Sequence, residues 1–343
     1  MARRPDRPST QADVARLAGV SVATVSYVAN GGRRDRKSAA TPEVTARVLA
    51  AMRELDYRPD RAGRMLARNR TDLVAVVAYT PFNPWMLNLI NEVEEVAAER
   101  GLDVVILRYG HTPKAVDRVE RQLLEGLADA AVVLGSPDWS AARAHRIARR
   151  IPVLITGDRY RPRGFDVMAQ HHTEAVRQAA EHLIERGVHR PAYFGGPVND
   201  NTDRVDAFVS TFRAHGYPED AIVVARRDDD TSGFFEFRDQ AMELLDRPRR
   251  RRPDGILASA DRAAISALWA AMQLGIAVPD QLKIIGSGNI PDGTEIKPAL
   301  TTIGADSAAY RPMLHRLLDR IDDPGATTGT LVVPWRLIVR ETT

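Results

Sequence analysis

Apolar residues near the start of the chain recur at helical spacing. Thr10 can cap a first helix, and Gly19 suits the left-handed turn that would end it. Ser21 is a suitable cap for a second helix over 22–29, whose valines would face a core. The apolar face expected for the first helix consists of Ala12, Val14, Ala15, Leu17 and Ala18. Two short helices joined by so tight a turn predict a helix-turn-helix, which presents its second helix to the major groove of DNA.

A third amphipathic helix is predicted to begin at Thr41, with Pro42 in its first turn. Its apolar stripe is formed by Val44, Val48, Met52 and Leu55. Together the helices would enclose one small core. The periodicity alone fits an ordinary helical hairpin equally well, so that alternative stays open at this point.

From Leu73 the pattern changes to short β-rich runs that alternate with amphipathic stretches. Strands are predicted at 73–79, 103–107, 130–134, 153–156, 192–194, 221–224, 255–258, 282–285 and 301–303, and a final β-rich run at 331–339. Helices are predicted from 84 onward and near 116–124, 141–148, 174–186, 202–215, 237–245, 263–274 and 310–321. This α/β alternation predicts two doubly wound parallel-sheet lobes, which leave a ligand-binding crevice at the carboxyl ends of their strands.

Charge is distributed unevenly along the 343 residues. Residues 1–70 carry 15 Lys and Arg against 7 Asp and Glu, a net charge of +8, whereas the whole chain carries only +3. The remaining residues therefore carry a net charge of −5. A basic head on a mildly acidic body favours contact between the head and a polyanion such as double-stranded DNA. A basic tail surrounded by solvent is the alternative.

Several other classes are disfavoured by composition. The chain has no cysteine, which excludes disulfides, thiolate metal sites and a cysteine nucleophile. No apolar run approaches the roughly 18 residues of a membrane span, and the arginine-rich start lacks the apolar stretch of a secretory signal. His171 and His172 are adjacent and no third ligand has suitable spacing, so we expect no metal, no cofactor and no enzyme activity.

The head resembles the headpiece of the LacI/GalR family of bacterial transcriptional repressors. The resemblance rests on residues 13–21 (DVARLAGVS), 23–26 (ATVS), 30–31 (NG), 47–48 (RV) and 55–59 (LDYRP), and 60–66 resemble the family's hinge helix. It implies a DNA-binding domain over 8–58 and a hinge over 59–71. The DNA contacts that it implies are Thr10, Ser21, Val22, Ala23, Thr24, Ser26, Tyr27, Asn30, Arg61 and Leu66.

In that family a leucine of each hinge helix wedges into the minor groove, and by position that residue is Leu66. Packing of Leu66 within an interdomain linker is the alternative. Tyr27 stands where the family usually has an arginine that grips guanine, so we expect a different operator. The loop over 31–40 is longer and more basic than usual; it either contacts the DNA backbone or is solvated.

The rest of the chain resembles the family's periplasmic-binding-protein-like core, through segments such as 81–84 (PFNP), 253–256 (PDGI) and 258–261 (ASAD). The resemblance implies an effector-binding and dimerisation domain over 72–343. Lobe 1 is expected at about 72–168 and 301–328, and lobe 2 at about 169–300 and 329–343.

By position, Asp158, Arg204 and Asp261 match polar residues that hold the effector in relatives, and Trp85 would form an aromatic wall. Asn289 lies in a segment, 286–289 (GSGN), that has lost an aromatic residue and carboxylates, and the usual Asp-Asn pair is replaced by two histidines. These departures argue against a simple sugar. Structural roles are the alternative: Asp261 as a helix cap, Arg204 in a surface pair and Trp85 in the core.

The resemblance implies a cytoplasmic, nucleoid-associated homodimeric repressor that binds a palindromic operator. Its small-molecule effector, for which a carbohydrate is one candidate, would bind between the lobes. A small-ligand binding protein without a role on DNA is the competing interpretation.

Overall fold

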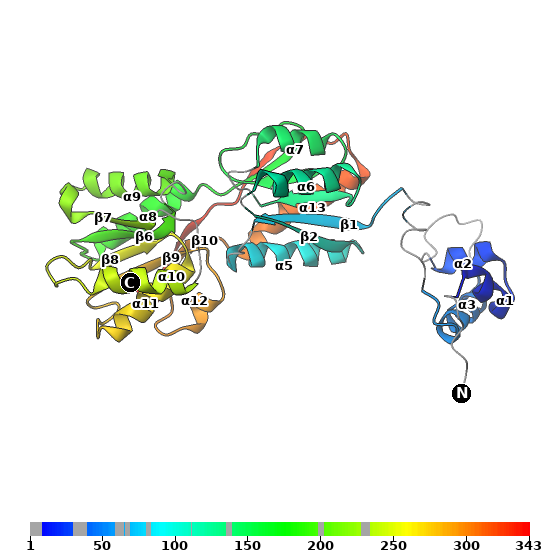
Figure 1. Cartoon of the computed structure of the whole chain (residues 1–343), viewed down its shortest axis with the longest axis horizontal. Helices are drawn as coiled ribbons and strands as arrows, with labels where there is room; N and C mark the ends of the chain where they lie inside the picture. Colours follow the sequence, from blue (N-terminus) through cyan, green and yellow to red (C-terminus); the bar gives the residue numbers. More distant parts are fainter. Residues whose placement is uncertain are drawn as a thin grey trace. The chain divides into compact units, whose positions relative to one another are not determined.

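The computed structural model describes residues 9–29, 40–58, 65, 69–79, 84–110, 112–134, 139–197, 202–227 and 234–343. The chain divides into two compact units, Met1–Asp72 and Leu73–Thr343. We call them the headpiece and the body (Figure 1). Each is described by itself.

The described headpiece contains the helices α1 (Gln11–Ala18), α2 (Val22–Ala29) and α3 (Pro42–Glu54). Thr10 caps α1: its side chain accepts a hydrogen bond from the Asp13 backbone N–H, while the Asp13 carboxylate accepts one from the Thr10 N–H. Gly19 adopts the left-handed conformation (φ 65°) that ends α1. Local capping chemistry therefore sets the ends of these helices where the sequence predicts them.

The headpiece core is small. It consists of Val14, Ala15, Ala18, Val25, Val28, Val48 and Ala51. Leu17 and Ala12, which the sequence placed on the apolar face of α1, do not belong to it, and Leu17 is 45% exposed. Both lie on the order of 100° around the helix from the middle of the buried stripe. An eight-residue helix that packs on one side cannot bury them.

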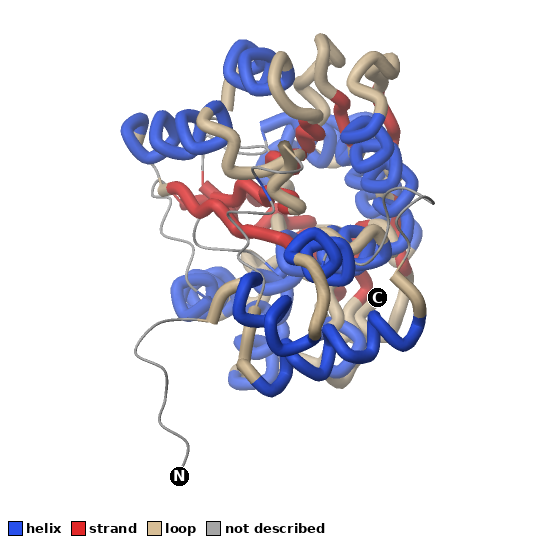
Figure 2. The backbone as a smooth tube through the Cα atoms, turned by 90° about the vertical axis from the view of Figure 1, so that its right-hand side faces the viewer, coloured by secondary structure: helices blue, strands red, loops and turns tan. Residues whose placement is uncertain are grey.

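The body is built on two six-stranded sheets with helices around them (Figures 1 and 2). The first has the order β11-β5-β4-β3-β1-β2, and all its pairings are parallel. Its strands are β1 (Leu73–Tyr79), β2 (Asp103–Tyr109), β3 (Ala130–Val133), β4 (Val153–Thr156), β5 (Asp166–Ala169) and β11 (Thr330–Val332). We call this sheet, with α5 (Pro84–Glu99), α6 (Pro113–Leu124), α7 (Ala141–Ala148) and α13 (Arg311–Asp322), lobe 1.

The second sheet has the order β12-β10-β9-β8-β6-β7, and only the pairing of β10 with β12 is antiparallel. Its strands are β6 (Pro191–Pro197), β7 (Val223–Arg227), β8 (Gly255–Ala258), β9 (Lys283–Ser287), β10 (Thr301–Gly304) and β12 (Arg336–Ile338). Lobe 2 is this sheet with α8 (His172–Glu185), α9 (Thr202–Ala214), α10 (Phe234–Leu245), α11 (Asp261–Gln273) and α12 (Asp292–Glu295).

The central strands are buried on both faces, as expected for a parallel sheet between helices. On β1, Val74 and Val76 join a core that includes Leu89 of α5, whereas Ala75 and Val77 face a second core that includes Val119 of α6. The period of two along the strand thus separates two apolar layers. This doubly wound arrangement confirms the fold class.

The division of the chain between the lobes differs from the one expected. Strand β10 lies in lobe 2 because it pairs with β9 and β12, although 301–328 were assigned to lobe 1. Strand β11 pairs with β5 in lobe 1, although 329–343 were assigned to lobe 2. The run predicted at 331–339 is therefore two strands in two sheets. The pairing of strands decides where the chain crosses from one lobe to the other, and no local sequence pattern predicts that pairing.

Two further strand predictions need correction. Strand β5 was not predicted, because its buried Asp166 interrupts the apolar pattern. Strand β7 begins at Val223 rather than at 221, because Ala221 closes a short 3-10 turn, Glu219–Ala221. The helices otherwise follow their predicted positions within a few residues.

Candidate DNA-binding surface and interlobe site

The first turn of α2 is exposed on the headpiece. The Ser21 hydroxyl starts the helix by accepting a hydrogen bond from the Thr24 N–H at 3.1 Å. Val22 is 46% exposed, whereas Val25 on the opposite side is fully buried and anchors the helix to the core. A helix N-terminus attracts phosphate, and the side chains of its first turn can reach base edges in a major groove.

The remaining predicted DNA contacts fall into two groups. Thr10 and Ala23 are exposed, and Thr24, Ser26 and Tyr27 are half-buried. Tyr27 packs against the headpiece core, so its ring is partly committed to structure. Three further predicted contacts, Asn30, Arg61 and Leu66, and the loop over 31–39 lie outside the described residues.

Trp85, at the start of α5, belongs to an aromatic cluster that connects the lobes. Its indole N–H donates a hydrogen bond to the Tyr310 hydroxyl at 2.9 Å. Its ring also lies 6.4 Å from the ring of Trp335, edge to face. Trp335 occupies the crossing between β11 and β12. Trp85 therefore combines a core contact with a position at the junction of the lobes.

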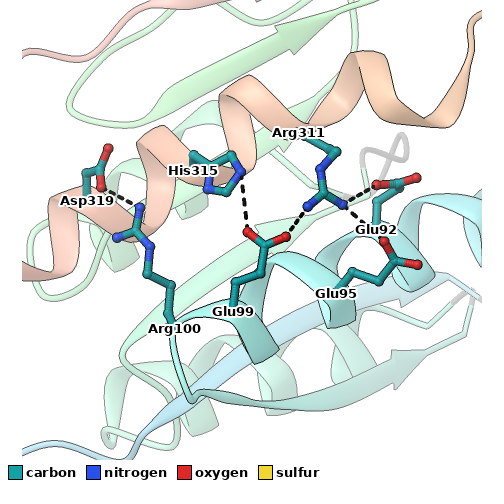
Figure 3. A network of polar contacts seen from close by, with 7 residues as sticks. All are labelled: Glu92, Glu95, Glu99, Arg100, Arg311, His315 and Asp319. Carbon is teal, nitrogen blue, oxygen red and sulfur yellow. Dashed lines mark hydrogen bonds and ion pairs between the residues drawn. The ribbon is translucent and has the colours of Figure 1, made fainter.

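Ion pairs join α5 to α13 within lobe 1 (Figure 3). Arg311, next to Tyr310, binds Glu92 and Glu95 at 3.1 Å each and also contacts Glu99. Arg100 and Asp319 add a second link of 2.7 Å along the same two helices. These ion pairs hold α13 against the later turns of α5, about two helical turns from Trp85.

His172 and Arg204 approach the same tryptophan from lobe 2. The His172 ring lies 4.3 Å from the Trp335 ring, edge to face, and the Arg204 guanidinium lies 5.4 Å from its centre. Gln170, two residues before His172, accepts a backbone hydrogen bond from Trp335 at 3.3 Å. We call Trp85, Gln170, His172, Arg204, Tyr310 and Trp335 the interlobe cluster.

Two nitrogen atoms of the interlobe cluster, His172 Nε2 and Arg204 Nε, are buried without a hydrogen-bond partner among the described residues. Two more buried nitrogens, Gln170 Nε2 and Trp335 Nε1, interact with the Tyr310 hydroxyl, which already accepts a hydrogen bond from Trp85. Gln170 is 4% exposed and Trp335 5%. Buried polar atoms are almost always paired in folded proteins, so such a concentration indicates a place for a ligand.

Electrostatics in the cluster disfavour extra positive charge. Burial, the Arg204 guanidinium and His171 hold the pKa of His172 well below its usual value of 6.5. His172 is therefore neutral near neutral pH. Its Nδ1 lies 3.7 Å from Asp158 Oδ2.

Asp158 is occupied by the protein itself. One carboxylate oxygen accepts the backbone N–H groups of Gln170 and His171 at 2.6 and 3.1 Å, and the other accepts that of His172 at 3.4 Å. His171 adopts a left-handed conformation (φ 49°). Asp158 thus fixes the chain where it enters α8, and in doing so positions His172.

Asp261 is buried in lobe 2 and likewise paired. It accepts hydrogen bonds from the Thr302 hydroxyl at 2.5 Å and the Ile290 N–H at 2.9 Å. Burial raises its pKa to about 6, while those hydrogen bonds oppose the rise. Although it is the first residue of α11, its side chain does not cap that helix. Its partners lie on other elements of the lobe.

The segment over 286–289 packs closely against the Asp261 carboxylate. A Cβ on Gly286 would lie 2.1 Å from Asp261 Oδ1, and one on Gly288 would lie 3.7 Å from the Cβ of Trp85. Asn289 accepts a hydrogen bond from Arg340 Nη2 at 2.7 Å and donates one to the Ala305 carbonyl at 3.2 Å. Asp261 and Asn289, both predicted to bind ligand, are thus hydrogen-bonded within the protein, in a segment whose Gly288 approaches Trp85.

Sequence reasoning missed several members of the interlobe cluster. His171 and His172 drew notice as a departure from the family pattern, but Gln170, Tyr310 and Trp335 carry no motif. They come from three distant segments that only the fold brings together. The sequence offered one indication of the cluster, which is Trp335, a large aromatic residue within the β-rich run predicted at 331–339.

Comparison with known proteins identifies the family of this chain. Residues 10–60 match the family model of bacterial regulatory proteins of the lacI family, and residues 180–343 match a periplasmic binding protein-like domain. The chain is 31% identical over 342 residues to the ribose operon repressor of Halalkalibacterium halodurans, covering 98% of this chain and 97% of that protein. The chain belongs to the LacI family of bacterial regulatory proteins.

Other LacI-family members agree with this assignment. Catabolite control protein A of Staphylococcus xylosus is 26% identical over 340 residues, covering 96% of this chain and 98% of that protein. A CelR–cellobiose complex matches with a TM-score of 0.64 at 25% identity, covering 98% and 100% of the two chains. A lac repressor dimer bound to operator and an anti-inducer shares the fold, with a TM-score of 0.77 at 23% identity over 98% and 99% of the chains.

This LacI-family protein is a DNA-binding transcriptional regulator controlled by a small-molecule effector, and it is not an enzyme. No group of three or more His, Asp or Glu side chains in the described part of the chain could hold a metal ion. Within the same residues no single helix is long and apolar enough to cross a membrane; the bent pair α1 and α2 passes by length and composition only.

Proposed function

We propose that the regulator represses transcription as a homodimer, with the first turn of α2 from each subunit in the major groove of a palindromic operator. The exposed Val22, opposite the buried Val25, supports this placement. Ser21, Ala23 and Thr24 complete the contact surface, with Tyr27 at its half-buried edge. Two-fold symmetry of a dimer calls for two half-sites.

The other parts of the proposal concern the hinge and the place of action. Arg61 would contact phosphate and Leu66 would wedge into the minor groove; both stay predictions from the family resemblance. Because its target is chromosomal DNA, the regulator acts in the cytoplasm, on the nucleoid.

The effector, we further propose, binds at the interlobe cluster. The buried nitrogens of His172 and Arg204, which have no partners among the described residues, support this placement, because a ligand would complete their hydrogen bonds. Trp85 and Arg204 contact the effector directly. Asp158, Asp261 and Asn289, predicted as ligand residues, contribute by holding the surrounding segments, since their side chains are already hydrogen-bonded.

The names of relatives indicate a hydroxylated small molecule. One relative is a ribose operon repressor, and one structural neighbour holds cellobiose. Effector and operator must affect each other equally: an effector that weakens operator binding is itself bound more weakly by the operator complex. The junction of the lobes is suited to such coupling, because the interlobe cluster draws residues from both.

Selection of binding sites from a randomised duplex library tests the DNA-binding part. We expect enrichment of a palindrome, and at least about tenfold weaker binding to it by Val22→Asp. Leu49→Asp is the matched control, because Leu49 is similarly exposed (43%, against 46% for Val22) but lies on α3. Equal losses in both variants would refute a specific role for α2. Effector binding without any sequence preference would identify a small-ligand binding protein instead.

A further inference from the structure

The interlobe cluster has more hydrogen-bond donors than free acceptors. Three buried nitrogens, in Gln170, Arg204 and Trp335, are N–H donors in any protonation state. Those of Gln170 and Trp335 share the Tyr310 hydroxyl oxygen with the Trp85 indole N–H, so the donors outnumber the acceptor that they face. The carboxylates nearby are already used: Asp158 by three backbone N–H groups and Asp261 by Thr302 and Ile290. A ligand that enters the cluster therefore meets donors and few free acceptors.

Arg204 adds a positive charge to this excess of hydrogen-bond donors. No carboxylate of the described residues pairs with it, and its Nε is buried against the cluster. An unpaired cation at a partly buried position is costly, and a charged hydrogen-bond partner removes that cost. Arg340, another guanidinium of lobe 2, is in contrast bound to Asn289 and to the Leu300 carbonyl. Among the described residues of the interlobe cluster, Arg204 is thus the cation left for the ligand.

We propose that the interlobe cluster contains a carboxylate subsite formed by Arg204, Gln170 and His172. The effector would accordingly be a hydroxylated carboxylic acid rather than a neutral sugar. This inference rests on the proposed effector site and adds the chemical class of its ligand. A single guanidinium matches one planar carboxylate, whereas a dianionic phosphate would call for further positive charge.

The remaining cluster members fit the rest of such a molecule. The half-buried ring of Trp85, which packs on Trp335 at 6.4 Å, offers apolar surface to C–H groups. His172 Nε2 can meet either a hydroxyl or the carboxylate, according to its protonation. A neutral sugar, in contrast, brings an O–H donor with every hydroxyl, and those donors would find few partners here.

Thermal unfolding of the full-length protein tests the class of ligand. The probes are sodium D-glycerate, D-gluconate and D-glucuronate, compared with glycerol, D-glucitol and D-glucose, with ionic strength kept constant by sodium chloride. We expect at least one acid to raise the Tm of the body by several degrees and to bind about tenfold more tightly than its neutral counterpart.

Arg204→Gln should abolish the response to the acid while leaving the unfolding temperature of the free protein unchanged or higher, because an unpaired charge is removed. Arg213→Gln is the control: Arg213 lies on the same helix, α9, and pairs with Glu219 at the surface. Gln170→Glu supplies a second variant, in which a new carboxylate should repel the acid.

The outcomes separate this inference from the proposed function. Stabilisation by a neutral sugar that equals that of its acid, and that is lost in Arg204→Gln, would overturn the carboxylate subsite but support the effector site. Stabilisation by an acid that survives Arg204→Gln would also overturn the subsite. No response to any probe would count against both.

Discussion

The two proposed recognition sites, on the headpiece and at the interlobe cluster, have opposite arrangements of their polar groups. On α2 of the headpiece, Ser21, Val22 and Ala23 are exposed, so their polar atoms are hydrated until DNA arrives. In the interlobe cluster, nitrogens of His172 and Arg204 are buried without partners among the described residues. Binding at the first surface exchanges water for DNA, whereas binding in the second supplies hydrogen bonds that the free protein lacks.

This difference has a consequence for stability. A ligand of the interlobe cluster should stabilise the body markedly, because it satisfies buried groups. The headpiece depends instead on a core of small residues such as Val14, Val25 and Val48, which can supply only a few kcal/mol. The two regions should therefore respond to different perturbations.

The largest effect is expected from Val25→Asp in the headpiece. Val25 is fully buried, and an unpaired carboxylate there should cost at least about 3 kcal/mol, enough to unfold so small a core. Operator binding should be lost while the thermal transition of the body and its response to effector persist. Calorimetry with a DNA-binding titration measures both. Val22→Asp, exposed on the same helix, should stay folded; loss of the body transition in Val25→Asp would show that the regions are not independent.

A smaller effect is expected from Asp158→Ala in the body. The change leaves the backbone N–H groups of Gln170, His171 and His172 without their acceptor, at a cost of about 2–4 kcal/mol. It should lower the Tm of the body and weaken the response to effector, but not alter the headpiece. An unchanged Tm would contradict the role of Asp158 as the anchor of α8.

Asp261 should make the stability of the body depend on pH. Its pKa is raised from 3.8 to about 6 in the folded protein, so protonation contributes stability that is fully present below about 3.8 and is lost as the pH rises through about 6. The effect is about 3 kcal/mol at most, since each pKa unit corresponds to roughly 1.4 kcal/mol. Asp261→Asn should flatten this part of the curve of Tm against pH. An identical slope in both proteins would assign the titration to another group.

Protonation of His172 should tune the carboxylate subsite. The groups that face its ring are Asp158, Arg204, His171 and Trp335. Because a bound anion offsets Arg204, it should raise the lowered pKa of His172, so acids should bind a few-fold more tightly as the pH falls from mildly alkaline to mildly acidic. Neutral sugars should show no such trend. Calorimetric titrations of wild type and His172→Gln would reveal it; an equal pH dependence in both would remove His172 from the subsite.

The smallest effect on stability, but a change in specificity, is expected from Tyr27→Arg. Tyr27 is half-buried at the edge of the headpiece core, so the substitution should cost about 1 kcal/mol or less. A guanidinium at this position could contact guanine, so the selected binding sites should shift toward G·C pairs. The same selected motif from both proteins would exclude Tyr27 from base recognition.

The accuracy of the sequence predictions follows the range of the interactions involved. The range of α2 was predicted without error because Gly19 and Ser21 act within a few residues. Strand β5 was missed because its buried Asp166 depends on distant partners: Arg320 and Arg316 of α13, at 2.8 and 3.2 Å, and the Gly329 N–H at 2.9 Å. The residues near Asp166 in the sequence do not predict those partners.

The candidate site shows the same limit. The resemblance pointed to Trp85 and Arg204, which the structure brings to one tryptophan, Trp335, from different lobes. It also pointed to Asp158 and Asp261, whose oxygens proved to be hydrogen-bonded within the protein. Residue type alone could not distinguish a free polar group from a satisfied one.

The amino-acid sequence by itself determined the helix-turn-helix, the alternation of strands and helices, and the family, because caps, glycines and apolar periodicity act over a few residues. The tertiary structure alone decided the order of strands in the two sheets, the crossings between lobes, and which of the polar groups kept free hydrogen-bonding capacity. The reason is physical: pairing of strands and satisfaction of buried polar atoms depend on partners that are distant in the chain and meet only in the folded protein.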